Sequence, residues 1–95
     1  MVKIINIRKQ PGTYENQHLA IVLFRWVNEQ TQVTGQTDPL GMYDWMVNKK
    51  GQAYIRSDQG NTIYVFARTS STGQPYLQAA KDGVWTDDLL NVPVF

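Results

Sequence analysis

Three carboxylates stand close together in the segment KDGVWTDDLLNVPVF at positions 81–95. Asp82, Asp87 and Asp88 are of the residue type that holds divalent cations or works as a paired general acid and base. A calcium loop of the EF-hand kind needs oxygen ligands at alternate positions, a Gly and a final Glu, and DGVWTDD lacks that spacing. A hydrolase would instead require these carboxylates to converge in a cleft. A metal-dependent hydrolase that uses them is therefore one hypothesis.

The same carboxylates also suit a turn and a helix start. Lys81-Asp82-Gly83 is typical of a turn, because Asp can bond its own downstream backbone and Gly accepts positive φ. Thr86 is expected to be an N-cap, with Asp87 and Asp88 in the first turn beside unpaired amides. We favour this interpretation, in which the segment fastens the C-terminus to the core. The residues that would complete it are Leu89, Leu90, Val92 and the terminating Pro93.

His18 is the only histidine, and the chain has no cysteine. Zinc sites are built from several Cys and His ligands, so one is not expected here. A catalytic triad would need Ser57, Ser70 or Ser71 to meet His18 in space. The prediction for His18 is a strand-edge residue hydrogen-bonded to backbone or water. We therefore expect no catalytic residue, no metal and no cofactor.

Aromatic and basic side chains alternate along residues 62–69. Tyr64, Phe66 and Arg68 share one face of the expected strand, and Tyr54 and Arg56 could adjoin them across a hairpin. Exposed rings set among basic side chains on a sheet can stack on nucleic-acid bases. This face is the candidate binding surface.

Two arrangements of that face remain open. In the favoured one it is a core face that the helix covers, with Tyr43 and Trp45 against the same rings, because small domains need aromatic side chains inside. In the other, the face with Arg56 and Arg68 is solvated. Three aliphatic residues would then line the core: Ile55, Ile63 and Val65.

The elements that must position these residues begin with a strand at 2–8 that ends at Pro11-Gly12. In HLAIVLFRWV at 18–27, apolar residues on both faces predict a central strand, with Ala20, Val22, Phe24 and Trp26 on one side and Leu19, Ile21 and Leu23 on the other. A β-hairpin follows at 53–69, and PYLQAA at 75–80 could add a strand.

The segment TDPLGMYDWMVNKKG at 37–51 carries the start and stop signals of the one expected helix. Thr37 or Asp38 would cap it, Pro39 suits the first turn, and Gly51 would end it in the left-handed conformation. The expected apolar face consists of Leu40, Tyr43 and Val47, with Met42 and Met46 beside them. The fold class is thus α+β, in the order β-β-α-β-β-β, with a mostly antiparallel sheet of four to five strands packed against one helix.

Composition narrows the functional classes. Ninety-five residues form one small domain, 1–95, and a net charge of +1 disfavours binding driven by phosphate contacts. The longest apolar run, LAIVLF, is far shorter than the roughly 20 residues of a membrane span. Without cysteine or a signal-like N-terminus, a soluble cytoplasmic protein is expected.

The C-terminal motif carries a family resemblance. Tyr76-Leu77, Asp82-Gly83, Thr86-Asp87-Asp88-Leu89-Leu90 and Val92-Pro93 resemble the ending of the small bacterial family called domain of unknown function 3892. That family has Tyr-Leu and Asp-Gly before Thr-Asp-Asn-Leu-Leu and Leu-Pro. The helix ending in Lys50-Gly51 and the strand with Tyr54 after it are similar too, so the likeness spans most of the chain. The chain departs from the pattern at Ala79, Asp88 and Val92. The resemblance implies a bacterial, cytoplasmic, often stand-alone domain with no established activity.

The favoured function is a non-enzymatic module that contacts a protein or peptide, through an exposed sheet edge or by self-association. The first alternative is single-stranded nucleic-acid binding through Tyr54, Arg56, Tyr64, Phe66 and Arg68. The second is the hydrolase that would use the three aspartates. No membrane contact is expected.

Overall fold

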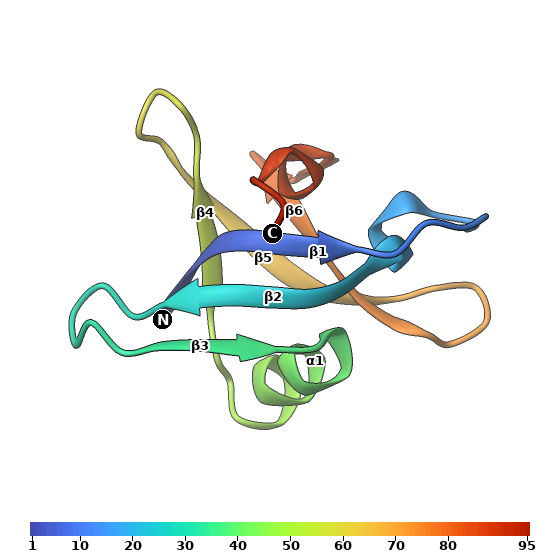
Figure 1. The fold of residues 1–95 in the computed structure, drawn as a ribbon, viewed down its shortest axis with the longest axis horizontal. Coiled ribbons are helices and arrows are strands. Elements are labelled where there is room, and N and C mark those ends of the chain that lie inside the picture. The colour runs from blue at the N-terminus through green and yellow to red at the C-terminus, as the bar shows by residue number, and fades with distance from the viewer.

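The chain forms one seven-stranded mixed sheet with a single α-helix and two short 3-10 helices, in a computed structural model that describes residues 1–95 (Figure 1). The α+β class with one helix is confirmed. The elements in chain order are β1 (Val2–Lys9), η1 (Gln17–Ala20), β2 (Ile21–Val27), β3 (Thr34–Thr37), α1 (Pro39–Asn48), β4 (Ala53–Arg56), β5 (Thr62–Thr69), β6 (Pro75–Lys81), β7 (Val84–Thr86) and η2 (Asp88–Asn91).

The strands lie in the order β3-β2-β1-β4-β5-β6-β7. Neighbouring strands are antiparallel except β1 and β4, which run parallel and pair at Val2–Ala53 and Lys3–Tyr54. The prediction of four to five strands is therefore wrong, because it missed the two edge strands, β3 and β7. β3 has the sequence TGQT, without apolar alternation, and β7 has three residues, so neither carries the periodic signal of a buried strand.

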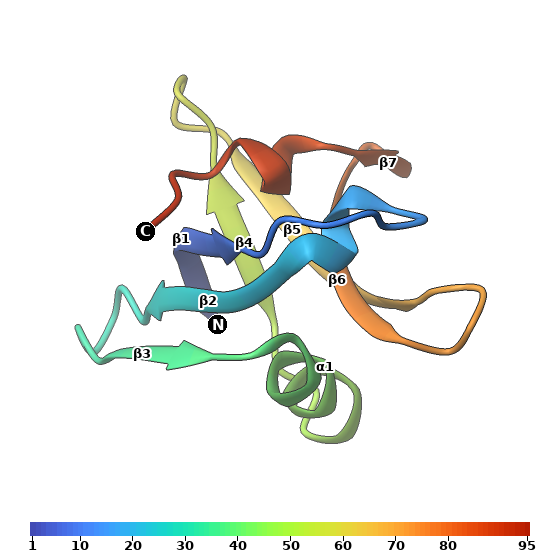
Figure 2. The same ribbon diagram turned by 45° about the vertical axis from the view of Figure 1, so that its right-hand side comes forward.

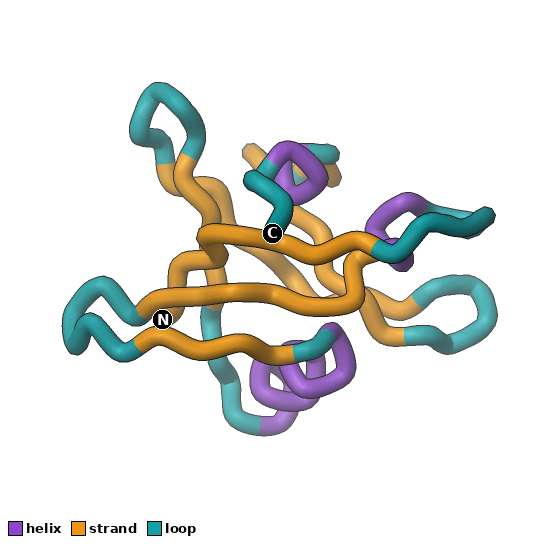
Figure 3. Tube along the Cα trace, viewed as in Figure 1, coloured by secondary structure: helices purple, strands orange, loops and turns teal.

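The sheet coils so that its two halves enclose the core. Figures 1 and 2 show β5 and β6 crossing behind β1 and β2, with β4 turning between them. Figure 3 shows the two 3-10 helices and α1 as separate helical segments around the strands. The largest fully buried side chains come from both halves and from η2, and burial of each contributes about 1.5–3 kcal/mol. They are Ile4, Ile7, Ile21, Phe24, Leu77 and Leu89.

Two bulges set which side chains of β1 and β2 face the core. The pairing of Arg8 with Leu23 and of Lys9 with Ile21 leaves Val22 as an extra residue. An extra residue reverses the alternation of a strand. Consequently Ile21 and Phe24, three positions apart, are both buried, and the predicted division of this strand into two regular faces is wrong.

The helix begins as its sequence indicates. The Asp38 carboxylate accepts a hydrogen bond from the Gly41 N–H at 2.8 Å, and Pro39 occupies the first position. Its end differs from the prediction, because Lys50, with φ 58°, takes the left-handed conformation expected of Gly51. Gly51 is instead required because a Cβ there would overlap the Trp45 ring.

The apolar face of α1 also differs from the prediction. Leu40 and Val47 are exposed, whereas Met42 is buried and Trp45 and Met46 pack against the core. The helix has ten residues and covers the core with one narrow stripe, so the apolar residues outside that stripe remain in solvent.

The C-terminal segment returns to β1. Leu89 of η2 lies in the core, and beyond it the Ile7 N–H donates to the Pro93 carbonyl at 3.0 Å while the Phe95 N–H donates to the Ile7 carbonyl at 3.1 Å. Arg8 also flanks the Phe95 ring, with its guanidinium carbon 4.4 Å from the ring centroid. These contacts occupy the edge of β1 that β4 leaves after Lys3.

Candidate binding surface

The outward face of β5 is solvated. Ile63 and Val65 point into the core, whereas Tyr64 and Phe66 are 44% and 46% exposed. The favoured interpretation, in which the helix covers these rings, is therefore wrong. The physical reason is that α1 packs against β5 and β6 from the core side, where Met42 joins Val65 and Leu77 in the buried cluster, so the rings on the other face of β5 stay in solvent.

Trp85, on β7, lies on the same face as the two exposed rings of β5. Tyr64 and Trp85 both pair with Ala80 of the intervening strand, which places them on one face of the sheet. Trp85 is 45% exposed and meets Phe66 edge to face, with ring centroids 6.1 Å apart. We call Tyr64, Phe66, Arg68 and Trp85 the aromatic face.

Arg68 is the charged member of this face. Its guanidinium carbon lies 4.1 Å from the Trp85 ring centroid, and its Nη1 donates to the Gln78 side-chain oxygen at 2.8 Å. The Gln78 amide donates in turn to the Thr86 carbonyl at 3.2 Å. Arg68 forms no ion pair. A positive charge without an acidic partner is thus held against an exposed indole.

Sequence reasoning missed Trp85. The signal lay in KDGVWT, because a two-residue Asp-Gly turn between strand-forming residues predicts a hairpin. Asp82 and Gly83 adopt φ values of 53° and 79°, as such a turn requires, and β7 follows directly. The hairpin register then carries Trp85 to the side of Phe66.

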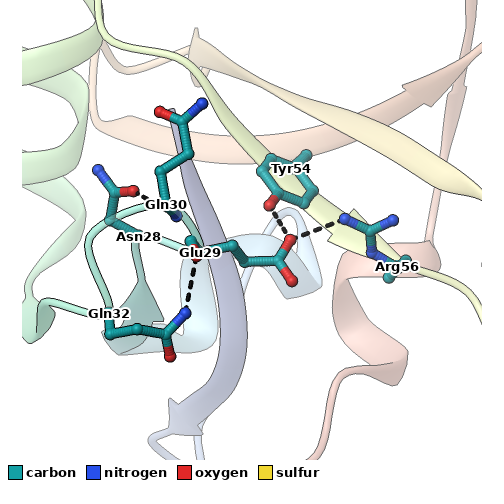
Figure 4. A network of polar contacts seen from close by, with 6 residues as sticks. All are labelled: Asn28, Glu29, Gln30, Gln32, Tyr54 and Arg56. Carbon is teal, nitrogen blue, oxygen red and sulfur yellow. Dashed lines mark hydrogen bonds and ion pairs between the residues drawn. The ribbon is translucent and has the colours of Figure 1, made fainter.

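Tyr54 pairs with Tyr64 across the hairpin, as predicted, but neither Tyr54 nor Arg56 is open to a ligand. Tyr54 is buried, and its hydroxyl donates to the Glu29 carboxylate, which Arg56 also contacts at 2.7 Å (Figure 4). The Tyr54 hydrogen bond, followed by that of Arg56, lowers the pKa of Glu29, and burial is the main cause that raises the pKa of Tyr54.

Glu29 belongs to the turn between β2 and β3, which is stabilised by hydrogen bonds among its own residues. The Gln32 side chain donates to the Glu29 carbonyl at 2.7 Å, and the Asn28 side chain accepts from the Gln30 N–H at 3.0 Å (Figure 4). The network therefore ties this turn to β4, and it neutralises Arg56, which sequence reasoning offered as a ligand contact.

The three aspartates lie on different elements. Asp82 stands at the tip of the β6–β7 hairpin, whereas Asp88 begins η2 and Asp87 precedes it. Asp87 takes the N-cap position that was predicted for Thr86. The Thr86 hydroxyl donates to Asp88 Oδ2 at 2.7 Å. No group of three or more His, Asp or Glu side chains is placed to hold a metal ion.

His18 lies in η1 and not at the edge of a strand, which corrects its prediction. It is 3% exposed, its Nδ1 is 2.8 Å from Asn16 Oδ1, and its Nε2 is buried without a hydrogen-bond partner. Burial is the main cause that lowers its pKa. It makes no hydrogen bond to any serine: Ser57 and Ser70 accept from neighbouring backbone and Ser71 contacts Glu15.

The remaining residues of the C-terminal motif pack in or against the core, except Pro93. Tyr76 and Leu77 are buried in β6, Leu90 packs partly against the core, and Pro93 is exposed where η2 ends. The longest helix, α1, has ten residues, and no helix of the chain combines the length and the apolar character that crossing a membrane requires.

Comparison with known proteins adds no relative. No family model matches the chain, and searches of the curated proteins and of the solved structures find no match.

Proposed function

We propose that the protein is a non-catalytic interaction module that binds a protein or peptide segment through the aromatic face. The observation that carries the proposal is that Tyr64, Phe66 and Trp85 are each nearly half exposed around an arginine without an acidic partner. Trp, Tyr and Arg are the residues that contribute most binding energy in protein interfaces. Exposed apolar side chains that lie together mark interaction sites, whereas single exposed apolar residues are normal on a protein surface.

The charge on this face favours a segment that combines apolar and acidic residues. Arg68 makes one side-chain hydrogen bond, to Gln78, so its other N–H groups have no protein acceptor and would suit an incoming carboxylate. The rings of Phe66 and Trp85 would contact aliphatic or aromatic side chains beside that carboxylate. Self-association is the less favoured form, because each copy would bring the same positive charge to a two-fold interface.

Single-stranded nucleic acid fits this geometry less well. Phe66 and Trp85 are at 86° to each other, so they do not offer parallel faces to successive bases. Arg56 is paired with Glu29, which leaves Arg68 as the cation on this face. The hydrolase hypothesis is also less favoured, because Asp82 is on a hairpin tip while Asp87 and Asp88 are at η2.

A displayed library of random peptides, selected against the whole protein, tests the proposal. We expect enrichment of sequences that place Asp or Glu next to Leu, Phe or Trp. Binding of an enriched peptide, measured by fluorescence polarisation, should weaken at least about tenfold in Arg68→Glu and in Trp85→Ala. Leu40→Ala is the matched control, because Leu40 is an exposed apolar residue on α1.

Two results would overturn the proposal. One is a peptide whose affinity is unchanged by both Arg68→Glu and Trp85→Ala. The other is tight binding of labelled oligothymidine or oligouridine that weakens steeply with salt and is lost in Arg68→Glu, which would establish the nucleic-acid alternative.

Family membership and a bacterial, cytoplasmic setting remain part of the proposal. The residue pattern from Tyr76-Leu77 to Val92-Pro93 is what supports the family proposal. The lack of cysteine supports a reducing compartment.

A further inference from the structure

A second concave site lies between α1 and the hairpin of β2 and β3. It is a pocket of about 430 Å³, and its lining includes Val2 and Met42, which otherwise belong to the buried core. Figures 1 and 2 show α1 following β3 directly and lying beside the two strands. Because core residues line it, the pocket reaches inward from the surface, and its volume is in the range of small-molecule sites.

Two tryptophans line this pocket, and each rests on a glycine. A Cβ at Gly35 would overlap the indole ring of Trp26, and a Cβ at Gly51 would overlap that of Trp45. The Trp26 Nε1–H also donates to the Thr37 hydroxyl at 3.0 Å. Rings held in this way lose little freedom when a ligand arrives, which favours binding.

The polar groups of the pocket are few and uncharged. Its other lining residues are Asn28, Thr31, Val33 and Thr37, so no ionisable side chain faces a ligand. The Asn28 Oδ1 already accepts from the N–H groups of Gln30 and Thr31. The side-chain amide of Asn28 is therefore left as a donor, and it suits an acceptor oxygen.

We propose that this pocket binds a small uncharged aromatic molecule that carries an acceptor oxygen. The aromatic ring would contact Trp26 and Trp45, and the oxygen would accept a hydrogen bond from the Asn28 amide. A charged ligand is disfavoured, because desolvation of its charge beside Val2 and Met42 would not be compensated by any opposite charge. The site is separate from the aromatic face and does not depend on it.

The three indole N–H signals of the protein provide the test. Acetophenone, added to the whole protein labelled with nitrogen-15, should shift the signals of Trp26 and Trp45 in a saturable way and leave that of Trp85 unchanged. Benzoate has the same ring with a negative charge, and the dissociation constant obtained from its shifts should be at least about tenfold higher. Since Trp85 belongs to the aromatic face, failure here leaves the proposed function untouched.

A matched pair of variants completes the test. Val33→Asp places a carboxylate at the mouth of the pocket, whereas Val84→Asp places one on β7, and the two valines are 56% and 64% exposed. Acetophenone should bind at least about tenfold more weakly to Val33→Asp and normally to Val84→Asp. Absence of saturable shifts, equal shifts of all three tryptophans, or unchanged binding to a folded Val33→Asp protein would overturn the proposal.

Discussion

At the level of single residues, His18 combines deep burial with an unpaired nitrogen. Three charged groups influence it: Asp87 at the N-cap of η2, Arg68 on β5 and Lys9 on β1. Burial lowers its pKa most, the two cations lower it further, and Asp87 opposes them. The ring of Tyr76 lies 6.3 Å from the imidazole on the remaining side. The folded protein therefore binds a proton at His18 less readily than the unfolded chain does.

Stability should consequently fall on mild acidification. As the pH falls below about 6.5, the unfolded chain takes up a proton at His18 before the folded protein does, so the free energy of unfolding decreases until the folded-state pKa is passed. Thermal unfolding between pH 7 and pH 5 should show a decreasing midpoint. His18→Gln should flatten this dependence, and an equally steep decrease in that variant would contradict the assignment to His18.

Residue alternation was enough to place part of the candidate surface. It put Tyr64, Phe66 and Arg68 on one face of β5, because a regular strand repeats every two residues. It could not reveal that Tyr54 is buried, since the covering residue, Glu29, comes from a turn 25 positions earlier. The burial of His18 is equally a consequence of tertiary packing, which no local pattern encodes.

At the level of elements, η2 fastens the C-terminal segment through one side chain. Leu89 is fully buried, whereas its neighbour Leu90 is only partly covered. Deletion of a buried Leu side chain leaves a cavity as well as losing apolar burial.

Leu89→Ala should therefore lower the free energy of unfolding by about 2–5 kcal/mol, and Leu90→Ala by less. Asp82→Asn is the control and should change it little, because Asn tolerates the left-handed conformation that Asp82 adopts. Denaturant titration measures all three. A loss below about 1 kcal/mol for Leu89→Ala would show that η2 does not anchor the segment.

Helix-cap and turn residues correctly predicted where several elements begin or end. Asp38 and Pro39 mark the start of α1, and the turn before Thr62 separates β4 from β5, because caps and turns depend on adjacent residues. The bulge at Val22 was not foreseeable, since it depends on how β2 pairs with a strand distant in sequence.

At the level of the whole molecule, the two sheet edges differ from the centre. β3 has four residues and β7 has three, and each pairs with a neighbour on one side only, whereas β5 is paired along both sides and contributes Ile63 and Val65 to the core. Local opening is easiest where backbone hydrogen bonds are few and burial is slight.

Amide hydrogen exchange should follow this gradient. Amides of Thr34–Thr37 and Val84–Thr86 should exchange faster than those of Thr62–Thr69 that pair with β4 and β6. Exchange measured residue by residue by NMR tests this. Equal protection of β7 and β5 would mean that the aromatic face is as rigid as the core.

The contact of each indole with a glycine also limits how the sequence can diverge. A side chain at position 35 would overlap the ring at position 26 unless that residue moved or became smaller, and positions 51 and 45 are linked in the same way. In descendants of this chain the two members of each pair should change together, so a lineage that replaces either tryptophan by a small residue becomes free to replace the glycine beneath it.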